Sequence, residues 1–201
     1  MSKRAATTHY PTSLVLTGDV ILANRDEEDG TGLIRVFFLD ARSRSVEGHL
    51  LSPCSDDERD GWFTIRHVPA TTRPLRLLDG GDEFMRQVPE EVDGSDPSKV
   101  VMDWTTMLAS GIGVVKEFNN RRKHGLLMGF TLMGDKNGWT RFDLRFKFDG
   151  LVSIGSLQVH TLVSFEAILA RIDEDGTPFI QVYNLVPLGK ADSDLTAALT
   201  E

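Results

Sequence analysis

The sequence predicts a mainly β (α+β) fold, an antiparallel β-sandwich or barrel with one principal helix packed across it. Residues 139–148 alternate strictly between apolar and polar side chains. Successive side chains of a strand point to opposite faces, so this segment is expected to bury one face and wet the other. Further short β-rich runs are separated by polar turns, of which Asn137-Gly138 is typical of a hairpin. The apolar parity holds Phe142, Leu144, Phe146 and Phe148, and the polar parity holds Arg141, Asp143, Arg145 and Lys147.

The first part of the chain reads as strands joined by polar loops. Strands are expected at residues 14–22, 33–39, 48–51 and 62–68, with loops at 25–32 and 56–61. Gly18 interrupts the first strand, which predicts a β-bulge there. Residues 69–98 contain four prolines and are expected to form an irregular excursion with one short strand at 75–78.

The principal helix is expected over residues 97–110. Ser95-Asp96-Pro97 combines capping side chains with a proline in the first turn. Apolar residues then recur at helical spacing, and Gly111 and Gly113 would end the helix. They are Val100, Val101, Trp104, Met107 and Leu108.

The rest of the chain predicts strands again, at 126–133, 139–148 and 179–188. Residues 157–172 fit both a strand and a helix; a strand is favoured because Asp-Glu-Asp-Gly at 173–176 then forms a turn. Trp104 and Trp139 are expected to anchor the core. The domain organisation predicted is a flexible arm at 1–12, a single β-rich domain at 13–189 and a loose acidic tail at 190–201. No internal repeat is visible.

Charge is unevenly distributed along the chain. The 201 residues carry a net charge of −8, which argues against a generic nucleic-acid coat. Residues 116–147, however, contain eight Lys and Arg against three Asp and Glu, a local net of +5. The single cysteine, Cys54, suits an intracellular, reducing compartment, and the N-terminus has no apolar signal core.

No signature of catalysis, metal or cofactor binding is present. The five histidines are scattered without metal-ligand spacing, and no phosphate loop, nucleophile elbow or zinc-protease helix occurs. We therefore expect no catalytic residues, no metal, no cofactor and no small-molecule substrate, and predict that the protein is not an enzyme.

Basic residues supply the candidate binding site. If the polar parity of 139–148 and the basic run after the helix share one face, they form an anion-binding surface for nucleic-acid phosphates or an anionic membrane. The alternative is that the run 121–123 only complements the dipole of the preceding helix. The candidate residues are Arg121, Arg122, Lys123, Arg141, Arg145 and Lys147. Separately, Tyr10, Pro11 and Leu14 resemble the Tyr-Pro-x(n)-Leu peptides by which viral proteins recruit budding machinery.

Residues 95–134 resemble the central region of rhabdovirus matrix proteins. The shared features are Ser-Asp before an amphipathic helix, Trp104 three residues ahead of Met107, a basic connection and an apolar strand closed by Gly134. The resemblance implies a viral structural protein of the virion that self-associates, lies at the periphery of the host-cell membrane and contacts the nucleocapsid or its nucleoprotein. The chain departs from that family in its acidic charge, its lack of a Lys-rich arm and its lack of a Pro-Pro-x-Tyr peptide.

The alternative resemblance is to oligonucleotide-binding (OB) barrels of the single-strand-binding type. Residues 16–20 and the hairpin 165–188 before an acidic tail are similar to the first and last strands of that family. The family stacks bases on exposed aromatic residues that alternate with cations. In 139–148 the phenylalanines instead share one apolar parity, which favours burial.

Overall fold

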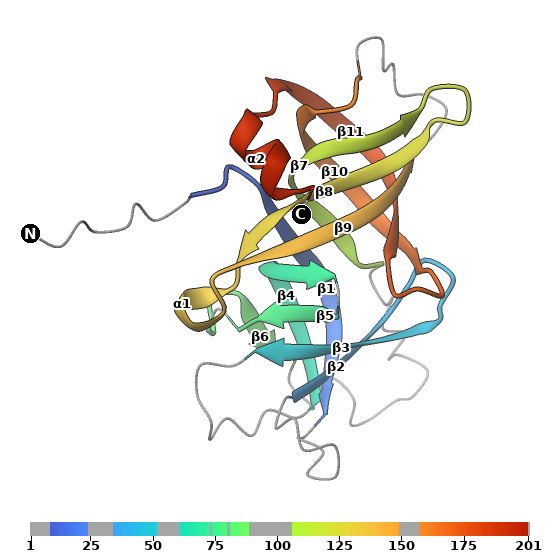
Figure 1. Cartoon of the computed structure of the whole chain (residues 1–201). Coiled ribbons are helices and arrows are strands. Elements are labelled where there is room, and N and C mark those ends of the chain that lie inside the picture. Colours follow the sequence, from blue (N-terminus) through green and yellow to red (C-terminus); the bar gives the residue numbers. More distant parts are fainter. Residues whose placement is uncertain are drawn as a thin grey trace, which may run out of the picture.

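The computed structural model describes residues 9–23, 34–51, 61–72, 74–79, 81–88, 106–148 and 157–200 (Figure 1). Strands dominate both halves of the chain. The N-terminal half contains β1 (Ser13–Ala23), β2 (Ile34–Leu39), β3 (Ser45–Leu51), β4 (Gly61–Thr72), β5 (Leu75–Leu78) and β6 (Met85–Gln87). The C-terminal half contains β7 (Leu108–Asn119), β8 (His124–Leu132), α1 (Gly134–Asn137), β9 (Trp139–Phe148), β10 (Thr161–Ile172), β11 (Pro178–Lys190) and α2 (Ser193–Ala198).

Strands β1–β5 close into a ring, the N-terminal barrel. β1 pairs with β2, and β2 pairs with β3, both antiparallel. β3 then pairs in parallel with β5, β5 pairs with β4, and β4 returns to β1. The small strand β6 adds to the outside of this ring by pairing with β4.

Strands β7–β11 repeat the same arrangement as the C-terminal barrel. β7 pairs with β8 and β8 with β9, again antiparallel. β9 pairs in parallel with β11, β11 with β10, and β10 returns to β7. The two barrels lie one above the other in Figure 1 and are joined by antiparallel pairing of β1 with β7. A closed five-stranded barrel of this strand order is the OB fold, and it occurs here twice.

Burial confirms the apolar parity predicted for 139–148, whereas on the polar parity Asp143 is buried instead of exposed. Phe142, Leu144, Phe146 and Phe148 all point into the C-terminal barrel and are at most 2% exposed. Two of these rings lie opposite glycines of β8: Phe142 faces Gly129, and Phe146 faces Gly125. A Cβ on Gly129 would stand 2.5 Å from Phe142 Cζ, and one on Gly125 would stand 2.8 Å from Phe146 Cζ. Gly125 and Gly129 therefore leave room for the large phenylalanine rings that lie beneath them.

The mainly β fold class is confirmed, but the last residues of the predicted helix form a strand. Residues 108–110, expected to end the helix, begin β7, and residues 97–105 lie outside the described part of the chain. β7 is paired on both sides, with β1 and β10. Gly111 allows this close approach, because a Cβ there would overlap the Ser13 carbonyl. Tertiary pairing thus overrides the local helical spacing, and one feature of the matrix-protein resemblance is lost over 108–110.

The C-terminal tail is ordered rather than loose. α2 packs against the outside of the C-terminal barrel, where Leu195 and Leu199 form a cluster with Val114 and Met128. Asp192 caps the helix by accepting a hydrogen bond from the Asp194 backbone N–H at 2.7 Å. Over the described ranges, α2 is the helix that packs on the outside of a barrel.

The structure confirms some of the other predicted elements and corrects others. The bulge at Gly18 is confirmed by the register shift in the β1–β4 ladder, and the strand preference for 157–172 is confirmed over 161–172 by β10. The short strand predicted at 75–78 is confirmed as β5, whereas other described residues of the expected excursion belong to the end of β4 and to β6. The predicted loops at 25–32 and 56–60 lie outside the described residues. Over the described ranges, no helix is long and apolar enough to cross a membrane.

Candidate functional site

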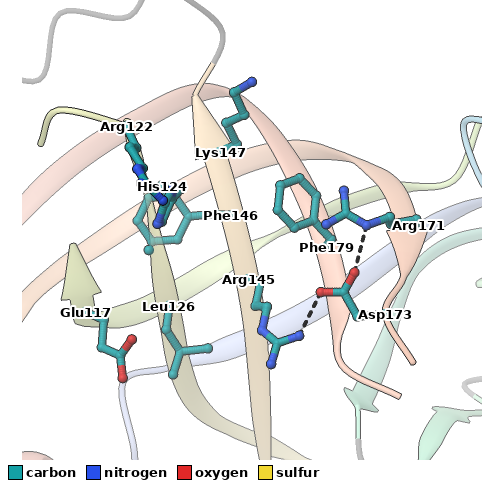
Figure 2. Close-up of a pocket in the computed structure, with 11 residues that line it drawn as sticks. Glu117, Arg122, His124, Leu126, Arg145, Phe146, Lys147, Arg171, Asp173 and Phe179 are labelled. Atoms are coloured by element: carbon teal, nitrogen blue, oxygen red, sulfur yellow. Dashed lines mark hydrogen bonds and ion pairs between the residues drawn. The ribbon is translucent and has the colours of Figure 1, made fainter. Parts of the chain in front are cut away.

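A pocket of about 650 Å³ opens on the outer face of the C-terminal barrel (Figure 2). Strand register sets its composition. His124 of β8 lies opposite Lys147 of β9, and Leu126 lies opposite Arg145, which in turn lies beside Phe179 of β11. We call this site the basic pocket, and its lining is Glu117, Arg122, His124, Gly125, Leu126, Arg145, Phe146, Lys147, Arg171, Asp173 and Phe179.

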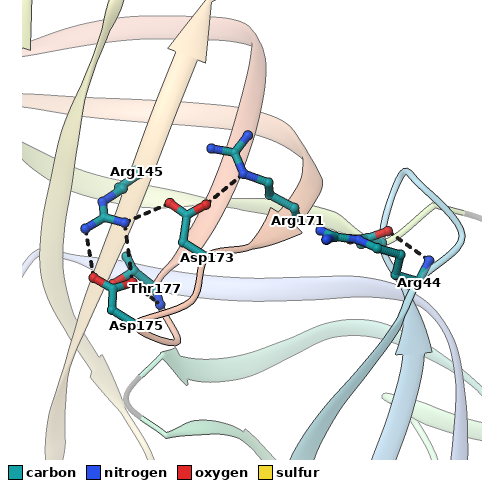
Figure 3. A network of polar contacts seen from close by, with 7 residues as sticks. Arg44, Arg145, Arg171, Asp173, Asp175 and Thr177 are labelled. Atoms are coloured by element: carbon teal, nitrogen blue, oxygen red, sulfur yellow. Dashed lines mark hydrogen bonds and ion pairs between the residues drawn. The ribbon is translucent and has the colours of Figure 1, made fainter.

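An ion-pair network crosses one side of the basic pocket (Figure 3). Arg145 Nη1 lies 2.8 Å from Asp173 Oδ2, and Arg145 Nη2 lies 2.8 Å from Asp175 Oδ2. Arg171 Nε lies 2.7 Å from the other oxygen of Asp173. The Arg171 guanidinium also stacks 3.8 Å from the ring centroid of Phe179. Two cations and two carboxylates here neutralise one another.

The network shifts the pKa of its members in the expected directions. Burial alone would raise the pKa of Asp173, but hydrogen bonds from Arg145 and Arg171 outweigh it and lower that pKa. The pKa of Asp175 is lowered, first by its hydrogen bonds with Thr177 and then by Arg145. The hydrogen bond to Asp173 raises the pKa of Arg145. Asp173, Asp175 and Arg145 are therefore charged at neutral pH.

Arg122 and Lys147 supply the uncompensated charge of the basic pocket. Both side chains are exposed, and neither forms an ion pair within the described part of the chain. Arg122 stands in the β7–β8 turn, where its backbone N–H donates to Asn119 Oδ1 at 3.1 Å. The pocket thus offers two free cations beside the apolar surface of Leu126 and Phe179, a combination suited to a ligand that has both anionic and flat apolar parts.

The predicted basic residues are brought together only in part. Arg122, Arg145 and Lys147 line the basic pocket, and Arg121 and Lys123 lie in the same β7–β8 turn. Arg141 stands near the other end of β9 and pairs with Asp143 at 3.1 Å. Because Arg141 and Arg145 both have carboxylate partners, the positive surface is smaller than the sequence suggests. The alternative of a helix dipole at 121–123 is wrong, since the segment before this turn is a strand.

Sequence reasoning missed Arg171 and Phe179. They come from β10 and β11, which the β10–β11 ladder places directly opposite each other. They reach the basic pocket because β11 pairs in parallel with β9, a connection between segments more than 30 residues apart. The only local signal is the Arg-x-Asp spacing of 171–173 before the predicted turn.

The Tyr10-Pro11-Leu14 segment is tied to the barrels. Leu14 belongs to β1 and is 1% exposed. The ring of Tyr10 stacks on Phe130, with centroids 4.3 Å apart. A recruitment peptide must be extended and accessible to its partner. For a partner to bind this motif, Leu14 would have to leave the core.

The N-terminal barrel carries a comparable surface on its second and third strands. Arg35 of β2 lies opposite His49 of β3, and His49 lies beside Arg76 of β5. Two positions along β2, Phe37 also points outward, and the Arg35 guanidinium lies 5.6 Å from its ring centroid. All four side chains are half-buried. We call this row the N-terminal face.

Comparisons with known proteins add little beyond the strand order. No protein-family model and no curated protein matches the chain. Among solved structures, a deletion mutant of the single-stranded DNA binding protein from Thermus aquaticus matches with a TM-score of 0.42 and 9% identity, over 92% of this chain and 98% of that chain. A likeness this slight carries no argument, so the fold assignment depends on the strand pairing described above.

Proposed function

We propose that this protein binds single-stranded nucleic acid across the outer faces of its two OB barrels. The observation that carries the proposal is the placement of cations beside aromatic rings on the outer faces of both barrels. In the C-terminal barrel Arg145 lies beside Phe179 and Lys147 lines the same pocket, and in the N-terminal barrel Arg35 lies beside Phe37.

The location of these residues supports the proposal. OB barrels bind oligonucleotides with strands 2 and 3 and with the loops that follow strands 1 and 4. In the C-terminal barrel those strands are β8 and β9, and the loop after the first strand carries Arg121, Arg122 and Lys123. Cations of a groove track the phosphate backbone, while aromatic rings stack bases irrespective of sequence. The acidic total charge is compatible with this, because the basic pocket offers two cations, Arg122 and Lys147, that have no ion-pair partner among the described residues.

The test is fluorescence anisotropy with a labelled oligothymidylate of about 30 nucleotides, roughly two OB site sizes. We expect binding at about 50 mM salt that weakens steeply toward about 200 mM. The double charge reversal Arg122→Glu with Lys147→Glu should lower affinity at least about tenfold. It should also reduce the slope of log affinity against log salt by about 1.4, because two phosphate contacts of about 0.7 each are lost. Arg86→Glu, in β6 and outside both faces, is the matched control. No change in anisotropy at micromolar protein would exclude the proposal.

Matrix-type assembly stays a prediction. It includes self-association, contact with an anionic membrane or a nucleoprotein, and location in a virion. No feature of the two barrels favours it over nucleic-acid binding.

A further inference from the structure

A second surface on β8 and β9 lies apart from the basic pocket. Phe130 and Leu132 of β8 and Trp139 and Arg141 of β9 occupy its outer face, where Phe130 is opposite Arg141 and Leu132 is opposite Trp139. Trp139 is half-buried here, so the expectation that it anchors the core is wrong. Leu132 is 47% exposed. We call Phe130 and Trp139 the aromatic platform; it lies four positions, roughly 13 Å, from the Leu126–Arg145 pair of the basic pocket.

The N-terminal segment covers this aromatic platform. Tyr10 stacks on Phe130 with ring planes 23° apart and meets Trp139 edge-on at 5.5 Å. His9 meets the same Trp139 edge-on at 5.2 Å. Proteins that bind single-stranded nucleic acid stack bases on aromatic side chains. If this protein does so as proposed, the Tyr10 ring occupies the place on Phe130, beside Trp139, that a base would take.

The anchor of the segment lies after Tyr10, not at it. Thr12 Oγ1 donates to the Phe130 carbonyl at 2.9 Å and accepts from the Phe130 N–H at 2.8 Å. The Leu14 N–H donates to Thr131 Oγ1 at 2.9 Å. Tyr10 is half-buried, stacks on Phe130 and also packs against the apolar cluster that contains Leu195 and Leu199. Swinging Tyr10 away therefore breaks stacking and apolar contacts while the chain stays fixed from Thr12 onward.

We infer that the aromatic platform is a nucleobase-stacking subsite and that Tyr10 occupies it in the free protein. The inference rests on the proposed function, and it adds that Tyr10 of the same chain competes with the nucleobase for this subsite. Binding of an oligonucleotide replaces the Tyr10 ring on Phe130 by a base, next to Arg141 and its ion-pair partner Asp143. The Tyr10 contact then lowers apparent affinity, since the site must first be vacated.

The test compares full-length variants by anisotropy with oligothymidylate and with an abasic oligonucleotide of the same length. Tyr10→Ala should bind oligothymidylate roughly three- to tenfold more tightly than wild type, the range set by the loss of one aromatic pair. The abasic strand should show no gain, because it has no ring to stack. Tyr10→Phe, which keeps the ring, should match wild type. Phe130→Ala in the Tyr10→Ala background should abolish the gain.

The outcomes separate this inference from the proposed function. If wild type binds and Tyr10→Ala binds equally or more weakly, the inference fails and the proposed function stands. A gain that is equal on the abasic strand also overturns it, because Tyr10 would then not compete with a base. If neither protein binds either strand, both fail. If thermal melting shows that the Tyr10→Ala variant is unfolded, Tyr10→Leu replaces it in the test. This variant keeps an apolar contact with Phe130 but has no ring, and it should also bind oligothymidylate more tightly than wild type.

Discussion

Arg145, in the middle of β9, and Asp173, directly after β10, form an ion pair of 2.8 Å across the basic pocket. The same carboxylate holds Arg171, whose guanidinium stacks on Phe179. One aspartate therefore fixes the positions of two cations and an aromatic ring while cancelling part of their charge. The free cations of the pocket, Arg122 and Lys147, stand outside this network.

Removing that carboxylate should strengthen nucleic-acid binding. In Asp173→Asn, Arg171 becomes available to phosphate while Arg145 keeps its ion pair with Asp175. We expect an affinity gain of about three- to fivefold at low salt, the scale of an ion pair worth up to about 1 kcal/mol. The log-salt slope should steepen by about 0.7. Anisotropy with oligothymidylate measures both. Asp194→Asn removes the same charge from α2; an equal gain there would show that only net charge matters.

Acid should destabilise the fold through the same network. The pKa values of Asp40, Asp173 and Asp175 are lowered in the folded state, so the unfolded chain binds more protons and stability rises with pH in that window. Their contribution is complete above the ordinary carboxyl value of 3.8 and is lost as the pH falls below it. Urea midpoints measured between about pH 5 and pH 3 should fall steeply.

The control for acid sensitivity is the triple variant with asparagine at positions 40, 173 and 175. Burial opposes ionisation of Asp40, but hydrogen bonds from the backbone and side chain of Arg44 and from the Arg42 N–H outweigh it. Removing all three carboxyls should make the urea midpoint depend less on pH. A variant as acid-sensitive as wild type would assign the effect to other carboxylates.

Gly129→Ala should destabilise the C-terminal barrel. Its Cβ would stand 2.5 Å from Phe142 Cζ and 2.9 Å from Thr12 Cβ, so a buried ring must shift, at a cost of about 3 kcal/mol in the free energy of unfolding. Gly176→Ala meets nothing within 4 Å and costs only its left-handed backbone at φ 77°, about 1 kcal/mol. Chemical denaturation compares the two; equal losses would contradict the packing argument.

Docking of the C-terminal helix should contribute to stability. Leu195 of α2 is 3% exposed, and Leu195→Ala should lower the free energy of unfolding by about 2–3 kcal/mol. Leu188 in β11 is 50% exposed, so Leu188→Ala should change it by less than about 0.5 kcal/mol. Hydrogen exchange of α2 amides should rise in the first variant only. No loss on Leu195→Ala would mean that the tail packs too weakly to matter.

If both barrels bind nucleic acid as proposed, affinity should depend on oligonucleotide length. Short oligothymidylates would engage one barrel, whereas longer ones would link both and gain affinity through effective concentration. Arg35→Glu with Phe37→Ala should remove the gain beyond one site size of about 4–16 nucleotides and leave binding to short strands largely intact. Length-series anisotropy measures this. Equal loss at every length would place all binding on the N-terminal face.

Local patterns identified most individual strands. Residues 139–148 show why: their period of two depends only on which side chains are apolar, and burial of Phe142 and Phe146 follows from it. The bulge at Gly18 was also predictable, since a glycine inside an apolar run has few other roles. By contrast, residues 108–110 carried a helical spacing that pairing with two neighbouring strands overrode.

The sequence alone determined a β-rich chain with a basic segment at 116–147 and the alternation that buries four side chains of β9. Only the tertiary structure decided that the strands close into two barrels of one topology, because ring closure depends on parallel pairing of β3 with β5 and β9 with β11, between segments distant in the chain. The same long-range pairing brings Arg171 and Phe179 to Arg145 and sets Asp173 against its charge. Local propensity carries no information about such pairings, so the site could not be assembled from the sequence.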